Sequence, residues 1–147
     1  MGADDSYDLK RFTCAQTGIY ARALSELRAG DKRSHWMWFI FPQVYGLGST
    51  PTASRYAIKS LAETRAYIEH PDLGPRLVEC AEALCAVEGR SALQIFGSPD
   101  DLKLWSSMTL FAWVAGVGSV FVQVLDKYYG GERDEHTLAF LNAMDEH

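Results

Sequence analysis

The sequence predicts an all-α fold, a single compact domain of six to seven helices around a tryptophan-rich central segment. Apolar residues recur every three or four positions along most of the chain, as on one face of an α-helix. Ser, Asp, Gly and Pro stand at the ends of these stretches, where helices begin and stop. With 147 residues, 48% of them hydrophobic, the chain suits one domain with one core. We expect residues 1–147 to form that domain, with 1–7 as a disordered N-terminal tail.

The first expected helix covers about residues 9–29, with Asp8 as its N-cap and Gly30 as its end. Gln16 and Tyr20 interrupt its apolar stripe, at positions where leucine would be ordinary. Buried polar groups need hydrogen-bond partners. These two side chains therefore either bond to each other or to backbone, or they face an internal cavity.

The central segment, residues 34–43, reads SHWMWFIFPQ and holds two of the four tryptophans. A domain of this size does not leave so much aromatic surface in water, so the segment belongs to the core. Ser34 is placed to cap a short helix that ends before Pro42. A buried strand is the alternative, but nothing nearby offers it a partner strand. His35 and Gln43 are polar groups that burial penalises unless they are partnered, which makes them candidates for a site.

The loop that follows, residues 43–52, is rich in glycine and hydroxyl groups. Gly46 and Gly48 permit a positive φ or close approach of the backbone to a ligand, and Ser49 adds a hydroxyl. The loop contains no GK[ST] motif and no GxGxxG after a strand. It is a generic phosphate-binding loop candidate rather than one defined by a motif.

Helices are expected in the middle of the chain at about 60–70, 73–88 and 92–96. Ser60 and Glu63 form a capping box at the start of the first one. His70 stands at its C-terminal end, where a cation is favoured, so a capping role suits it better than catalysis. Gly89 and Gly97 end the next two helices.

The last third of the chain predicts helices at about 98–115, 120–129 and 134–144. Ser98 and Pro99, followed by two acidic residues, mark the start of the first. Ser106 and Ser107 interrupt its apolar surface, so their hydroxyls either bond to the preceding turn or face a pocket. Asp134 is expected to cap the last helix.

Composition argues against several classes of function. A net charge of −5 does not suit a nucleic-acid-binding surface, which needs clustered Lys and Arg. The longest apolar run, residues 36–41, is too short to span a membrane, and no signal-peptide pattern is present, so we expect a cytoplasmic protein. The three cysteines lack CxxC spacing and are expected to be small buried thiols. The four histidines are scattered, so neither a metal site nor a cofactor is predicted.

Several strings along the chain match one known family: DLKRF at 8–12, KRSHWMWFIFPQ at 32–43, GPRL at 74–77, and DLKL with SSMTLF at 101–111. Together they resemble the uncharacterised bacterial domain-of-unknown-function family numbered eighteen-ten, over nearly the whole chain. The resemblance implies a small, mainly α-helical, single-domain protein and brings no known activity. Members are sometimes labelled calpastatin. A calpain inhibitor of that kind is an extended, disordered chain, whereas this composition is that of a packed globule.

A fainter likeness is to the YbiA-like N-glycosidases, small helical enzymes that cleave N-glycosidic bonds of ADP-ribose-type compounds. It rests on similar size and on a His-Pro-x-Leu…Leu pattern at residues 70–77. Those enzymes depend on acidic residues near a tryptophan-rich pocket, and their catalytic acids do not map residue by residue onto this chain. The likeness is therefore an analogy between folds.

The predicted site gathers the polar residues that interrupt apolar faces, together with the tryptophans. Its indoles would stack a flat ring such as a nucleobase or nicotinamide. His35 is the candidate general acid or base because imidazole titrates near neutral pH, and Asp101 would polarise His35 or Lys103. Any phosphate would be held by Arg33, Lys103 and the glycine loop. The expected ligand-binding residues are Gln16, Tyr20, Arg33, Trp36, Trp38, Gln43, Gly46, Gly48, Ser49, Lys103, Ser106 and Ser107, with Trp105 as a further aromatic wall.

Three functions stay open from the sequence. The first is binding of a small planar, nucleotide-like ligand, with or without phosphate, in a pocket lined by Trp, His and Gln. The second is an N-glycosidase-type hydrolase that acts on ADP-ribose-like compounds. The third is a structural or protein-interaction module with no small-molecule site, in which the tryptophans are core. A monomer or a homodimer is expected, with a small-molecule ligand and with neither nucleic acid nor membrane as a partner.

Overall fold

The computed structural model describes residues 5–48 and 50–145, which contain ten α-helices. They are α1 (Lys10–Gln16), α2 (Tyr20–Ala29), α3 (Met37–Ile40), α4 (Pro51–Arg55), α5 (Leu61–Glu69), α6 (Leu73–Ala86), α7 (Ala92–Phe96), α8 (Asp100–Ala115), α9 (Val120–Tyr129) and α10 (Glu135–Asp145). The all-α prediction is confirmed. The count exceeds six to seven because the first expected helix is divided, because α4 adds a helix, and because the short helices expected near 34–41 and 92–96 form elements of their own, α3 and α7. In the described residues, one parallel bridge between Val44 and Ile58 is the only β feature.

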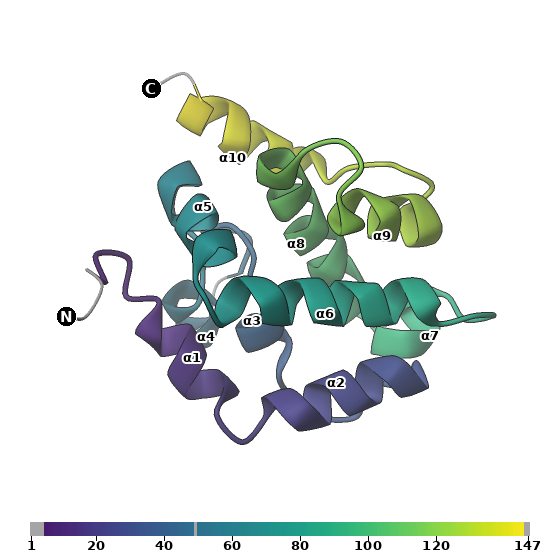
Figure 1. The fold of residues 1–147 in the computed structure, drawn as a ribbon. Coiled ribbons are helices and arrows are strands. Elements are labelled where there is room, and N and C mark those ends of the chain that lie inside the picture. Colours follow the sequence, from purple (N-terminus) through teal and green to yellow (C-terminus); the bar gives the residue numbers. More distant parts are fainter. Residues whose placement is uncertain (1–4, 49, 146–147) are drawn as a thin grey trace.

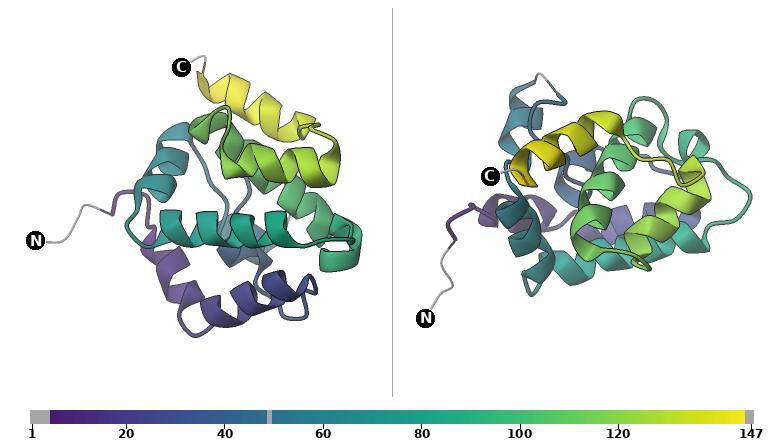
Figure 2. Two further views of the ribbon diagram at one scale, coloured as in Figure 1. Left: turned by 45° about the vertical axis from the view of Figure 1, so that its right-hand side comes forward. Right: turned by 90° about the horizontal axis from the view of Figure 1, so that it is seen from above.

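Helix α6 runs through the middle of the molecule, with α2 on one side and α9 on the other (Figure 1). Helix α8 packs on α5, α7, α9 and α10, so it joins the two halves of the chain. The turned views in Figure 2 show α10, the yellow C-terminal helix, on the outside of the bundle. None of the helices within 5–48 and 50–145 has both the length and the apolar character that crossing a membrane requires.

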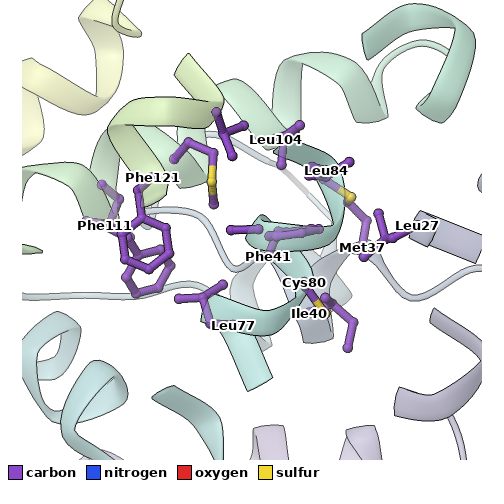
Figure 3. Close-up of a cluster of buried hydrophobic side chains, with 14 of the residues drawn as sticks. Leu27, Met37, Ile40, Phe41, Leu77, Cys80, Leu84, Leu104, Phe111 and Phe121 are labelled. Carbon is purple, nitrogen blue, oxygen red and sulfur yellow. The ribbon is translucent and has the colours of Figure 1, made fainter. Parts of the chain in front are cut away.

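The core draws side chains from most of the helices, and Figure 3 shows the cluster around Phe41 and Leu77. Trp36, Met37, Ile40 and Phe41 are each at most 2% exposed. The expectation that the central segment lies in the core is confirmed for these four residues, whereas His35 is exposed and Trp38 is half-buried. Each such side chain contributes on the order of 1.5–3 kcal/mol when it is fully buried.

The first expected helix is two helices, because the chain turns at Gly18, whose φ is +77°. The predicted cap is also corrected. Asp8 has a φ of +51°, and in the described part of the chain its side chain makes no cap bond. Asp5 accepts from Leu9 N (2.7 Å) and from Lys10 N (3.2 Å) instead. The described part of the expected tail is therefore tied to α1, and residues 1–4 lie outside the described residues.

The carboxylate of Glu26, on α2, organises the chain that leads into the central segment. It accepts hydrogen bonds from Arg33 N (2.8 Å), Ser34 N (3.0 Å), the Ser34 hydroxyl (2.7 Å) and Trp36 Nε1 (2.9 Å). Ser34 is thus a partner of Glu26 and not the helix cap that we expected, and α3 is a single turn. Partial burial by itself raises the pKa of Glu26, but these hydrogen bonds lower it, and the result is about 2 against an ordinary 4.5.

Helix ends elsewhere follow the sequence, with one reversal. Ser60 accepts from Glu63 N at the start of α5, as the capping box predicts. His70 follows the last residue of α5, but its Nδ1 accepts from Asp72 N (3.0 Å) and Leu73 N (3.2 Å). His70 is thus the C-cap residue of α5, as expected, but its imidazole accepts N–H groups at the start of α6 instead of acting as a cation at the end of α5.

Candidate functional site

A cavity of about 430 Å³ lies where α3 and α4 face α8 and the start of α10. Two indoles line it, those of Trp38 and Trp105. Its other apolar wall residues are Leu47, Ala53, Pro99 and Leu102. Its polar wall residues are Gln43, Thr50, Lys103, Ser106, Asp134 and His136, with Gly48 between them. The size and the mixture of apolar walls with a few polar groups are typical of a small-molecule site.

Trp105 is held in place from two directions. Its Nε1 donates to Glu132 O (2.9 Å), and its ring stacks on Tyr129 with the centroids 6.0 Å apart and the planes at 27°. Tyr129 is itself fixed, because its hydroxyl donates to Asp101 O (2.5 Å). The indole therefore reaches the cavity in a defined orientation.

Asp100, in the first turn of α8, connects the two lysines that contact the tryptophans of the central segment. Its carboxylate lies 2.8 Å from Lys32 Nζ and 3.2 Å from Lys103 Nζ. Lys32 Nζ is 5.0 Å from the Trp36 ring centroid, and Lys103 Nζ is 4.3 Å from that of Trp38. These ion pairs and cation–π contacts hold the tryptophan segment against the start of α8. They thereby position one wall of the cavity.

Asp134, 4% exposed, joins α10 to α8 at the opposite wall. Its Oδ2 accepts from the hydroxyls of Ser106 (2.7 Å) and Thr137 (2.6 Å), and its Oδ1 accepts from His136 N (3.2 Å). The expected cap of the last helix is confirmed by the bond from His136. The carboxylate also orients Ser106, whose single proton is directed to Asp134 or to Leu102 O (3.2 Å).

Several of the predicted ligand-binding residues come together at this cavity. Trp38, Gln43, Gly48, Lys103 and Ser106 all line it, although they come from α3, the following loop and α8. Asp134 and His136 were not among the predicted site residues. The only signal at Asp134 was that of a helix cap, and Ser106, its partner, is 28 residues away in sequence.

The candidate acid or base lies elsewhere. His35 is exposed and, with Arg33 and Trp36, lines a separate hollow of about 360 Å³. Arg33 Nε bonds to Asp31 (2.8 Å), and Trp36 is fully buried against the core with its Nε1 on Glu26. The prediction that these residues share one pocket with Trp38 is therefore wrong. The indole of Trp36 is held in the core because its N–H donates to Glu26 and because the ammonium of Lys32 lies over its ring.

Gln16 is an internal amide with every polar atom partnered. It is 2% exposed, its Nε2 donates to Phe39 O (2.8 Å) and lies 3.4 Å from the Tyr67 hydroxyl, and its Oε1 accepts from Arg76 Nη1 (3.1 Å). Tyr20 donates its hydroxyl proton to Glu79, and burial together with this bond raises its pKa. Neither side chain lines the cavity. Of the two alternatives for Gln16 and Tyr20, internal hydrogen bonding therefore holds and the cavity does not.

The remaining predicted residues are spread around the cavity or away from it. Ser107 is fully buried, and among the residues that the structure describes its hydroxyl has no hydrogen-bond partner, whereas Ser106 back-bonds to the preceding turn. Asp101 does not line the cavity, and its buried Oδ1 has no partner within residues 5–48 and 50–145. Gly46 has a φ of +99° and is exposed outside the lining, and Ser49 lies outside the described residues.

The cysteines are all free thiols, as expected, but they are not all buried. Cys80 is buried, and burial raises its pKa to about 12. Cys85 is half-buried, and Cys14 is exposed, which corrects the expectation for that residue. No group of three His, Cys, Asp or Glu side chains suited to a metal ion occurs in residues 5–48 and 50–145.

Comparison with known proteins places the chain in a family. A family model described as "Protein of unknown function (DUF1810)" matches residues 6–141. The crystal structure of the conserved hypothetical protein Rv1873 from Mycobacterium tuberculosis is similar, with 56% sequence identity and a TM-score of 0.92 over 94% of this chain and 99% of that one. None of the curated proteins matches. The resemblance expected from the sequence is confirmed, and the chain belongs to the family of proteins of unknown function DUF1810.

Proposed function

We propose that this protein binds a small planar ligand in the cavity lined by Trp38 and Trp105. The observation that carries the proposal is that two indoles from different helices line one cavity of about 430 Å³ together with Lys103, Ser106 and Asp134. Aromatic walls hold a flat ring by stacking, and the polar groups fix its orientation. The volume suits a ring system with one or two substituents.

The arrangement is set before any ligand arrives, which supports binding over a purely structural role. Trp105 is fixed by Glu132 and Tyr129, and the carboxylate of Asp134 is fixed by three hydrogen bonds, two from hydroxyls and one from a backbone N–H. Little conformational entropy is then lost when a ligand enters, so more of the contact energy appears as affinity. A structural tryptophan core would not need polar groups that converge on a cavity.

The lining of the cavity favours a planar ring in the ligand more than it favours a phosphate group. Among the described residues that line the cavity, Lys103 is the one Lys or Arg, and Asp100 already neutralises it at 3.2 Å. Arg33, the other expected phosphate contact, lies at the separate hollow with His35. A planar, uncharged or positively charged ring therefore fits the site better than a nucleotide held through its phosphate.

Catalysis on an N-glycosidic bond is the second candidate, and one observation favours it. Asp134 is the one carboxylate among the described residues that line the tryptophan cavity. Cleavage of a glycosidic bond builds positive charge on the sugar, which a carboxylate stabilises. His35 has no part in this version because it lines the other hollow.

The test is calorimetric titration of the purified protein with nicotinamide, adenine, NAD and ADP-ribose, followed by mass spectrometry of the mixtures. We expect one or more planar compounds to bind, and Trp38→Leu to weaken binding about 10-fold or more, since stacking on one ring is worth about 1–3 kcal/mol. Trp113→Leu is the matched control, because Trp113 is half-buried on α8 and does not line the cavity. Absence of binding across the set contradicts the proposal, and a cleaved product that Asp134→Asn abolishes establishes the glycosidase.

A further inference from the structure

A second hollow, of about 710 Å³, adjoins the tryptophan cavity. Trp105, Asp134 and His136 line both, so these three side chains form the wall that the two hollows share. The second hollow is otherwise lined by the segment that enters α10, including Glu132 and Glu135. A ligand larger than one ring therefore has a defined place into which it extends.

The charge of this second hollow is negative. Glu132, Asp134 and Glu135 provide three carboxylates, against the single guanidinium of Arg133. Both glutamates are exposed, and in the described part of the chain neither forms an ion pair. The carboxylates of the hollow thus outnumber its guanidinium by two (three against one), in a protein whose net charge is already −5.

The indole of Trp105 adds a second attraction for positive charge. One of its faces is covered by Tyr129, and its N–H is bonded to Glu132 O, so the ring stands fixed between the two hollows. The face of an indole attracts organic cations, and neighbouring carboxylates reinforce that attraction. Lys103, lying 4.3 Å from the Trp38 ring centroid, is an internal example of such a contact at the same site.

We propose that the ligand is a small organic cation, a planar ring that carries or adjoins a quaternary or protonated nitrogen. The ring occupies the tryptophan cavity, and the positive nitrogen lies on Trp105 facing Glu132, Asp134 and Glu135. This inference rests on the proposed function and specifies its ligand class. The same carboxylates disfavour an anionic extension such as a phosphate.

Three pyridine compounds of nearly equal size test the charge: nicotinamide is neutral, 1-methylnicotinamide is a cation and nicotinate is an anion. In calorimetric titrations at low salt we expect the cation to bind about 3- to 5-fold more tightly than nicotinamide, and nicotinate to bind most weakly. The double variant Glu132→Gln with Glu135→Gln should reduce the advantage of the cation, since Trp105 and Asp134 remain, and leave the affinity for nicotinamide unchanged. Glu88→Gln is the matched control, an exposed carboxylate outside both hollows.

The outcomes separate the two proposals. Equal affinity for the cation and for nicotinamide, or tightest binding of nicotinate, overturns the charge inference and leaves the planar-ligand site intact. An advantage of the cation that is undiminished in the double variant also overturns it, since Glu132 and Glu135 would then contribute nothing to the attraction. Absence of binding by all three compounds counts against both proposals. Melting temperatures of the variants within a few degrees of the parent show that folding is not the cause.

Discussion

Lys103 Nζ lies 4.3 Å from the centroid of the Trp38 ring and 3.2 Å from Asp100 Oδ1. The ammonium therefore links the first turn of α8 to the single turn of α3, across the wall of the cavity. Asp100 holds a second lysine, Lys32, whose side chain is 7% exposed. The tryptophan-rich segment is thus attached to α8 by charge as well as by apolar packing.

Asp100→Asn should destabilise the protein more than Lys103→Met. The first change removes the charged partner of two lysines, one of them buried, and we expect a loss of about 2 kcal/mol. The second change keeps the aliphatic stem over Trp38 and loses only a cation whose side chain is 22% exposed, for a loss of about 0.5–1 kcal/mol. Urea unfolding of both variants measures the difference. Equal losses would show that the Lys32 pair contributes nothing beyond that of Lys103.

Glu26→Gln should lower stability in a pH-dependent way. Because the pKa of Glu26 falls from 4.5 to about 2 on folding, its charge stabilises the native state above about pH 4.5, and this contribution is lost as the pH falls toward 2. We expect the variant to be less stable by about 2 kcal/mol at pH 7. The gap to the parent should narrow between pH 5 and pH 3 in urea unfolding. A gap that does not change with pH contradicts this account of the carboxylate.

Gly74→Ala should destabilise, although alanine normally favours a helix over glycine. A Cβ at this position would lie 1.9 Å from Ile68 O, a backbone atom that has no room to move away. We expect a loss of about 3 kcal/mol or more, where propensity alone predicts a gain of about 1 kcal/mol. Thermal unfolding, with the exposed α6 substitution Glu82→Ala as control, measures the sign. Stabilisation would mean that α5 and α6 separate at little cost.

Asp134→Ala and Asp134→Asn should differ. Alanine removes the N-cap of α10 and the acceptor for the Ser106 and Thr137 hydroxyls, so we expect a loss of about 2–3 kcal/mol. Asparagine keeps one acceptor oxygen and is a good N-cap, so the loss should be about half of that. Chemical denaturation of the two variants compares them, and similar losses would show that the negative charge, and not the cap, is what matters.

The helices that depend on local signals were predictable from the sequence. The spacing of apolar residues located α5, α8 and α9 to within a few residues. Ser60 correctly marked the N-terminus of α5. Helix caps that involve distant carboxylates were not predictable. Ser34 looked like a cap, but the Glu26 carboxylate, from the preceding helix, takes its N–H and its hydroxyl.

The site was predictable only in part, for a similar reason. Gln43, Lys103 and Ser106 stood out as polar interruptions of apolar surfaces, and they do line the cavity. His35 interrupts the most apolar string of the chain in the same way, but it points outward where α3 begins after a turn. Asp134 already had a sufficient explanation as a helix cap, so nothing in the sequence indicated that its carboxylate also faces Trp105 and Ser106.

The most direct measurement is a titration followed by NMR of the four tryptophan indole N–H signals, which report Trp36, Trp38, Trp105 and Trp113 separately. The protein is titrated with 1-methylnicotinamide, nicotinamide and adenine in turn. We predict that the signals of Trp38 and Trp105 shift with a common saturation curve, while those of Trp36 and Trp113 stay in place and serve as internal controls. Movement of Trp36 or Trp113 alone, or no movement of any signal at saturating compound, would contradict a planar-ligand site between Trp38 and Trp105.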